Sequence, residues 1–194
     1  MVKERKINEQ INQLNQEGKA VVFIITGNNS AGKTALTLKL LKNLYFYQSI
    51  NLGLASKIIR FFREDLAVND LENFNGGKAS DIFRRIVDFI AQSYQETGVN
   101  IIIDGVQIDT ERLLESPNII GGVILVVDEA IAVKRGENPE THFKRKISEK
   151  GLKNIEYFEN RKFRKVNNNG NIERTYQETI DYLQKLLTEE LQNG

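Results

Sequence analysis

Residues 20–47 join a strand pattern to a helix pattern through a short glycine-containing loop. Apolar and β-branched residues fill positions 20–26 without polar alternation, which indicates a strand buried on both faces, as in the middle of a parallel sheet. Residues 33–47 repeat leucine at helical spacing, with a predicted core face of Leu36, Leu40, Leu41 and Leu44. A strand, a tight loop and a helix in this order predict an α/β fold built around the loop.

The loop has the spacing G-x-x-x-x-G-K-[ST], which is typical of a phosphate site. Gly27 permits a backbone geometry barred to residues with a Cβ atom, and Gly32 lets the backbone approach a ligand closely. Lys33 supplies positive charge for β- and γ-phosphates, and the Thr34 hydroxyl is a ligand for Mg²⁺. Backbone N–H groups of the loop and of the helix start favour an anion. The predicted nucleotide-binding residues are Gly27, Asn28, Asn29, Ser30, Ala31, Gly32, Lys33 and Thr34.

A second apolar run, residues 99–104, ends in Asp104 and is followed at once by Gly105. An acid at the end of a buried strand reaches Mg²⁺ directly or through a bound water. The alternative role for this acid is a helix cap or a turn residue. With the loop nearby, Asp104 and Thr34 are the predicted metal ligands.

The remaining patterns fill out one α/β domain. Ile7, Ile11 and Leu14 form one apolar stripe, which we expect to pack on the outside of the fold, with a partner-binding helix as the alternative. The other predicted elements are a helix over 4–17 that ends at Gly18, a second strand over 54–62, a helix over 81–97, a fourth strand over 122–127, a helix running to about Arg135, a fifth strand near 165–167 and a helix over 172–191.

Charged residues follow the predicted second strand, where open α/β sheets bind their ligands. We therefore expect the substrate near this point, and a solvated loop is the alternative. The candidate substrate-binding residues are Arg60, Arg63, Glu64 and Asp65.

Residues 134–165 carry eleven lysines and arginines against five glutamates, so their net charge is 11 − 5 = +6. Such a segment can close as a lid over a phosphoryl group and neutralise its charge. The alternative is a solvated helical face with salt pairs.

Composition limits the class of protein. The 194 residues suit a single domain, 1–194, with an N-terminal helix in 1–18. The net charge of +1 shows no excess of positive charge of the kind that favours binding to nucleic acid or to a membrane surface. The chain has no cysteine and no apolar run that suits a membrane span or a signal peptide. We expect a cytoplasmic protein, and a homodimer is left open.

In its order of elements the chain resembles the P-loop kinases of nucleosides, nucleotides and small metabolites. The matching residues are the Walker A loop at 27–34, Ile-Ile-Ile-Asp-Gly-Val at 101–106, and the basic stretch where these enzymes carry a lid. Uridine-kinase-like enzymes share the N-terminal helix and the acid-Gly-Val step. The 2-phosphoglycerate-kinase-like proteins share that step and a basic segment similar to residues 142–164. Arg63-Glu64-Asp65 replaces the paired-aspartate motif that uridine kinases carry after strand two.

The resemblance implies a three-layer P-loop NTPase fold, with a five-stranded parallel sheet in the order 2-3-1-4-5 and helices on both faces. It also implies ATP with Mg²⁺ as donor. A carboxylate at 64 or 65 would be the base or orienting group for the acceptor, and Lys134, Arg135, Arg145 or Lys146 would belong to the lid. The implied catalytic set is Lys33, Asp65, Arg135 and Arg145.

These observations predict an ATP-dependent phosphotransferase with a small-molecule acceptor such as a nucleoside, a nucleotide or a phosphorylated small acid. One alternative is an ATPase or switch that acts on a partner; the chain lacks the Asn-Lys-x-Asp motif that reads guanine, which argues against GTP. The other is a kinase for a larger acceptor, either a nucleic-acid end or a toxin-type target, which the near-neutral charge disfavours.

Overall fold

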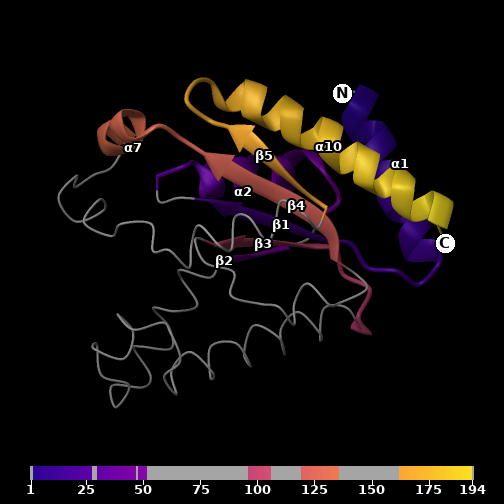
Figure 1. Ribbon diagram of the computed structural model, residues 1–194. Coiled ribbons are helices and arrows are strands. Elements are labelled where there is room, and N and C mark those ends of the chain that lie inside the picture. Colours follow the sequence, from indigo (N-terminus) through magenta and orange to yellow (C-terminus); the bar gives the residue numbers. More distant parts are fainter. Residues whose placement is uncertain are drawn as a thin grey trace, which may run out of the picture.

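The computed structural model describes residues 2–27, 30–46, 48–51, 96–105, 119–135 and 162–193. Figure 1 shows a sheet with two long helices side by side on one face. The elements are α1 (Val2–Gln16), β1 (Val22–Gly27), α2 (Lys33–Asn43), β2 (Gln48–Asn51), β3 (Ile101–Gly105), β4 (Ile119–Val126), α7 (Glu129–Arg135), β5 (Phe163–Asn167) and α10 (Ile172–Asn193).

The strands form one five-stranded parallel sheet in the order β2-β3-β1-β4-β5. The predicted fold class, an α/β fold with strand order 2-3-1-4-5, is therefore confirmed. β1 lies between β3 and β4, which explains its unbroken apolar run, because a central strand is covered on both faces. The register pairs both Ile25 and Asn51 with Asp104, so three strands bring their carboxyl ends to one edge.

Side chains alternate between the two faces of the sheet. Phe23, Ile102 and Val123 belong to one core cluster with residues of α1, α2 and α10. Ile24 and Ile103 on the opposite face are also fully buried. Of the helices expected on both faces, the described ones α1, α2 and α10 pack on the first face. Residues 81–95 of the predicted helix 81–97 lie outside the described residues.

The N-terminal helix packs as predicted. The stripe of α1, Ile7, Ile11 and Leu14, is at most 1% exposed and lies in the core cluster, with α1 running beside α10 (Figure 1). Each buried aliphatic side chain contributes about 1.5–3 kcal/mol. This stripe belongs to the fold and is not exposed for a partner.

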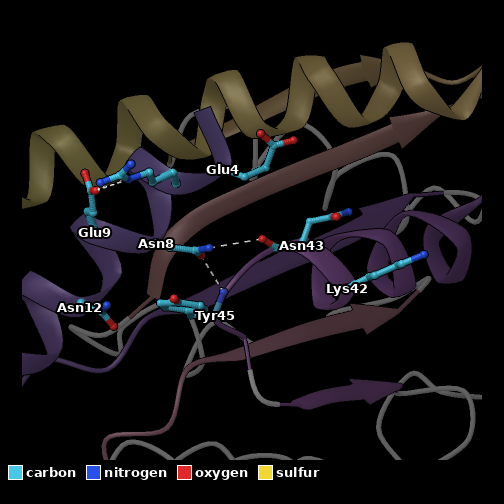
Figure 2. A pocket seen from close by; sticks show the side chains of 8 residues that line it. Glu4, Asn8, Glu9, Asn12, Lys42, Asn43 and Tyr45 are labelled. Carbon is cyan, nitrogen blue, oxygen red and sulfur yellow. Dashed lines mark hydrogen bonds and ion pairs between the residues drawn. The ribbon is translucent and has the colours of Figure 1, made fainter. Parts of the chain in front are cut away.

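The second strand comes earlier than predicted. α2 ends at Asn43 rather than at residue 47, and β2 spans Gln48–Asn51. The turn is set from outside the helix, because Asn8 of α1 donates to the Asn43 carbonyl and accepts from the Tyr45 amide (Figure 2). The predicted strand 54–62 lies outside the described residues. Because β2 ends at Asn51, beside Asp104, residues 60–65 do not directly follow this strand.

The end of the predicted basic lid is part of the sheet. Residues 163–165 open β5, with Phe163 and Val166 buried and Arg164 and Lys165 exposed. β5 pairs with β4 over its whole length, and Phe163 and Val166 lie on opposite faces of the strand because they are three residues apart. The last three residues of the predicted lid segment therefore belong to β5, which begins two residues before the fifth strand predicted near 165–167, and the lid itself stays a prediction.

Among the described helices, none has the length and apolar character that a membrane span requires.

Candidate functional site

The loop between β1 and α2 depends on two glycines. Gly27 has φ 138°, and a Cβ there would lie 2.2 Å from the carbonyl oxygen of Leu125. Gly32, the N-cap of α2, has φ 87°, and its Cβ would meet the side-chain nitrogen of Asn168 at 2.4 Å. Both positions exclude a side chain, since φ is left-handed and the space is occupied. The loop therefore sits close to β4 and to the end of β5.

Lys33 opens α2, and its ammonium group donates to the carbonyl oxygen of Gly27 at 3.2 Å. Burial lowers the pKa of Lys33 to about 8, while the negative charge of Asp104 acts in the opposite direction. Burial disfavours the charged ammonium because it loses hydration. An anionic ligand beside Lys33 would stabilise that charge.

Asp104 lies near the end of β3 and is only 1% exposed. Asn51, the last residue of β2, donates its side-chain amide to this carboxylate. Burial raises the pKa of Asp104, against the lowering effects of Thr37, Lys33 and Asn51. The structure thus brings the predicted acid and the predicted lysine into electrostatic contact across two elements.

The residues present fit a magnesium ion in this fold. Mg²⁺ takes oxygen ligands and is commonly held by one or two carboxylates together with substrate phosphates and waters. Asp104 is a buried carboxylate of this kind, and Thr34, an exposed residue in the first turn of α2, carries a hydroxyl group. The buried Thr37 oxygen also has no hydrogen-bond partner of ordinary geometry among the described residues. A metal held mainly by protein needs more acids, and the described residues contain no cluster of three or more.

The turn between β5 and α10 contacts both the loop and α7. Asn168 donates to the carbonyl of Ala31 at 2.7 Å. Asn169 accepts from the backbone amide of Asp128 at 2.7 Å, and Arg135 donates to the carbonyl of Gly170 at 3.2 Å. The end of α7, with the predicted lid residue Arg135, is therefore fixed against this turn.

The structure places only part of the predicted site. Gly27, Lys33, Thr34 and Asp104 come together at the carboxyl edge of the sheet, along with residues 30–32. Arg135 lies near that edge, bonded to the turn before α10. The predicted residues outside the described part are Asn28, Asn29, Arg60, Arg63, Glu64, Asp65 and Arg145.

Three polar residues of the site were not predicted. Asn51 and Asn168 donate to residues far away in the chain, and Thr37 of α2 lowers the pKa of Asp104 on β3. Asn168 stands in Asn-Asn-Asn-Gly, which reads only as a turn. No local sequence signal separates it from the asparagines on either side, because its partner Ala31 is 137 residues away.

A separate open groove of about 550 Å³ lies between α1 and the C-terminal end of α2 (Figure 2). Gly32 and Lys33 stand at the other end of α2. The helix has 11 residues, which at 1.5 Å per residue separates the two places by about 16 Å. The groove is not part of the loop site.

No family model matches the chain, and a comparison with curated proteins finds no match. Among solved structures, an uncharacterized protein from Eubacterium ventriosum is 16% identical, with 91% of this chain and 100% of that chain covered and a TM-score of 0.50. Shikimate kinase from Bacteroides thetaiotaomicron is 19% identical over 87% and 98% of the two chains, with a TM-score of 0.49. TT1252 from Thermus thermophilus is 14% identical over 89% and 98%, also at 0.49. At 16% identity the first of these likenesses shows the fold alone.

Proposed function

We propose that this protein is an ATP-dependent phosphotransferase that moves the γ-phosphoryl group of ATP, with Mg²⁺, to a small-molecule acceptor. The observation that carries the proposal is the arrangement of Lys33 and Asp104. A half-buried lysine opens the helix after the loop, and a buried acid lies one residue before the end of the neighbouring strand. A lysine for phosphates and an acid for the metal are the two charges that a metal–nucleotide complex requires.

Within this proposal, the chain acts mainly by positioning and by neutralising charge. The N–H groups at the start of α2 and the Lys33 ammonium bind the phosphates, which places the γ-phosphoryl group for attack. Thr34 and Asp104 would hold Mg²⁺, which would neutralise charge on the phosphate oxygens. Asn51 orients Asp104 by occupying one of its oxygens. Arg135, Arg145 and Asp65 are proposed for the lid and for the acceptor.

The acceptor class is proposed from the likeness to P-loop kinases of nucleosides, nucleotides and small metabolites. A screen of ATP consumption against nucleosides, nucleoside monophosphates and phosphorylated three-carbon acids separates the uridine-kinase-like from the 2-phosphoglycerate-kinase-like proposal. Turnover that depends on one of these classes identifies the acceptor. ATP hydrolysis that is independent of every acceptor would instead favour an ATPase or switch.

The nucleotide site is tested by replacing Lys33. Lys33→Ala removes the charge that faces the β- and γ-phosphates, and we expect the affinity for MgATP to fall at least tenfold, about 1.4 kcal/mol. Lys42→Ala is the matched control, because Lys42 is an exposed lysine in the last turn of the same helix. Both variants are measured by titration calorimetry. Wild-type affinity in Lys33→Ala would remove the basis of the site assignment.

A further inference from the structure

Asn168 is a buried polar residue at the junction of β5 and α10. It directly follows β5 and is 3% exposed. Its backbone N–H donates to the carbonyl of Val126 at the end of β4, at 2.9 Å. The backbone of Asn168 is therefore fixed to the sheet at the same edge as the loop.

The side-chain amide of Asn168 has one arrangement that satisfies both of its neighbours. The carbonyl of Ala31 can only accept, so the NH₂ group must face it, at 2.7 Å. The amide oxygen then accepts from the hydroxyl of Thr175, also at 2.7 Å. Thr175 is 1% exposed. A buried network in which each polar atom has a partner holds one conformation.

The hydrogen bond from Asn168 to the Ala31 carbonyl fixes the orientation of the peptide group between Ala31 and Gly32. The peptide between Ala31 and Gly32 is trans, since the described residues contain no cis bond. In a planar trans peptide the C=O and N–H point in opposite directions. With its carbonyl held by Asn168, the N–H of Gly32 is directed to the other side of the loop.

An external contact of this kind supports the loop at a point where one described residue, Ser30, has a strained backbone. Ser30 has φ 58°, in the left-handed region. A non-glycine residue there is strained and persists where the surroundings fix it. The Asn168 amide packs directly on Gly32, as the 2.4 Å to a Cβ built there indicates.

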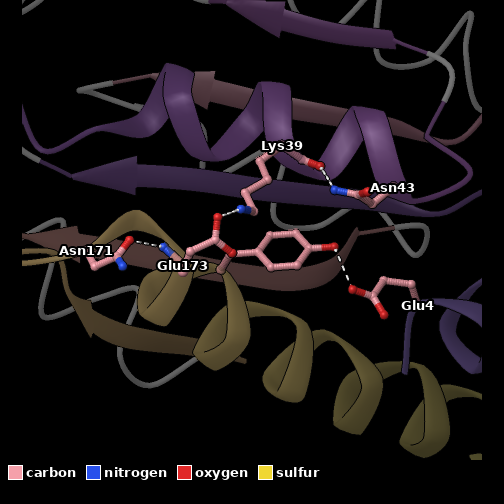
Figure 3. Close-up of polar contacts among 6 residues, drawn as sticks. Glu4, Lys39, Asn43, Asn171 and Glu173 are labelled. Carbon is pink, nitrogen blue, oxygen red and sulfur yellow. Dashed lines mark hydrogen bonds and ion pairs between the residues drawn. The ribbon is translucent and has the colours of Figure 1, made fainter. Parts of the chain in front are cut away.

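The first turn of α10 is itself anchored, as Figure 3 shows. Asn171 accepts from the backbone N–H of Glu173 at 2.8 Å, and Lys39 of α2 forms an ion pair with Glu173. Thr175 lies two residues further along this turn. The donor that orients Asn168 is thus held in place from both α2 and the helix cap.

We propose that Asn168 is a positioning residue for the phosphate loop: it turns the Gly32 N–H toward the phosphates, so that nucleotide affinity depends on the β5–α10 turn. The proposal rests on the proposed function, because it requires the loop to bind phosphate. It assigns Asn168 no contact with ATP.

Asn168→Asp tests the proposal with little change of shape. The carboxylate has no hydrogen to give to Ala31 and repels its carbonyl, so we expect at least a tenfold loss of affinity for inorganic tripolyphosphate and for ATP. Asn171→Asp is the control: it adds the same charge at an exposed position three residues further along the chain and keeps the oxygen that accepts from Glu173. We expect less than a threefold change for this control. Tripolyphosphate is used because it lacks a base and a sugar.

A second pair of variants separates positioning from stability. Thr175→Val removes the hydroxyl that orients the amide, and Thr175→Ser keeps it. We expect weaker tripolyphosphate binding in the valine variant and wild-type binding in the serine variant, both measured below the melting temperature of each protein. This pair also decides the question if Asn168→Asp does not fold.

The outcomes distinguish the two proposals. Wild-type affinity in a folded Asn168→Asp protein, or equal affinities in Thr175→Val and Thr175→Ser, overturns the positioning role. If Lys33→Ala also binds tripolyphosphate like the wild type, the proposed function fails as well. If Lys33→Ala loses binding while the Asn168 and Thr175 variants keep it, only the positioning role fails.

Discussion

At the scale of single residues, the site combines two glycines that have no room for a side chain with two charged residues whose charges are disfavoured by burial. Gly27 and Gly32 have left-handed backbone and no room for a Cβ. Lys33 and Asp104 carry charges that burial disfavours. Strain and buried charge of this kind are concentrated at functional sites.

Gly27→Ala should destabilise the protein strongly. The new methyl group would lie 2.2 Å from the backbone oxygen of Leu125, which cannot rotate away, at a φ of 138°. We expect a loss of about 2 kcal/mol or more in the free energy of unfolding, measured by urea denaturation. Gly170→Ala is the control, because a Cβ there meets no atom within 4 Å. Equal stability of the two variants would contradict the loop geometry.

Asp104→Asn should separate stability from binding. The neutral amide avoids burying a charge and can still accept from Asn51. We therefore expect an unfolding free energy at neutral pH equal to the wild type or up to about 2 kcal/mol higher, together with weaker binding of MgATP. The exposed Asp181→Asn on α10 should leave MgATP affinity unchanged. Unaltered MgATP affinity in Asp104→Asn would remove Asp104 from the metal site.

At the scale of elements, α1 is a part of the core rather than an appendage. Ile11 is fully buried in the cluster shared with α10. We expect Ile11→Ala to cost about 2–5 kcal/mol of unfolding free energy. Gln13→Ala on the exposed side of α1 should stay within about 0.5 kcal/mol of the wild type. A small loss at Ile11, measured by the same denaturation, would mean that α1 is loosely attached.

Asn8 of α1 hydrogen-bonds to the end of α2, and its replacement should lower stability and loosen the structure near Tyr45. Asn8→Ala leaves the Asn43 carbonyl and the Tyr45 amide without this partner (Figure 2), and we expect about 1 kcal/mol lower stability. Asn12→Ala, one turn further along and exposed in the same groove, should change stability little. Hydrogen exchange at Tyr45 gives a second measure, with faster exchange expected in Asn8→Ala only.

At the scale of the whole molecule, the sequence predicted the elements whose burial is strong. β1 and α10 have long apolar patterns, and their predicted positions differ from the observed ones by at most two residues at either end. β2 was misplaced because only Ile50 of its four residues is buried and it lies at one end of the strand order. An edge strand this short and polar carries too few core contacts to produce a period-2 signal.

The site residues that belong to a local sequence pattern could be predicted, and those whose roles depend on partners far away in the chain could not. The loop from Gly27 to Thr34 carries its own spacing, and Asp104 ends an apolar strand. Asn51 and Asn168 act through partners 53 and 137 residues away, so their roles follow from the strand order and not from a local pattern. The acceptor side remains a proposal, since residues 60–65 lie outside the described residues.

The most direct test of the phosphotransferase proposal is phosphoryl transfer itself. ATP, Mg²⁺ and the acceptor panel are incubated with the wild type and with Lys33→Ala, and ADP and the phosphorylated product are measured together. We predict that the wild type forms ADP and phosphorylated product in equal amounts with one acceptor class, and that Lys33→Ala forms at least a hundredfold less of both. ADP formation whose rate does not depend on any acceptor, or equal turnover by Lys33→Ala and the wild type, would contradict the proposal.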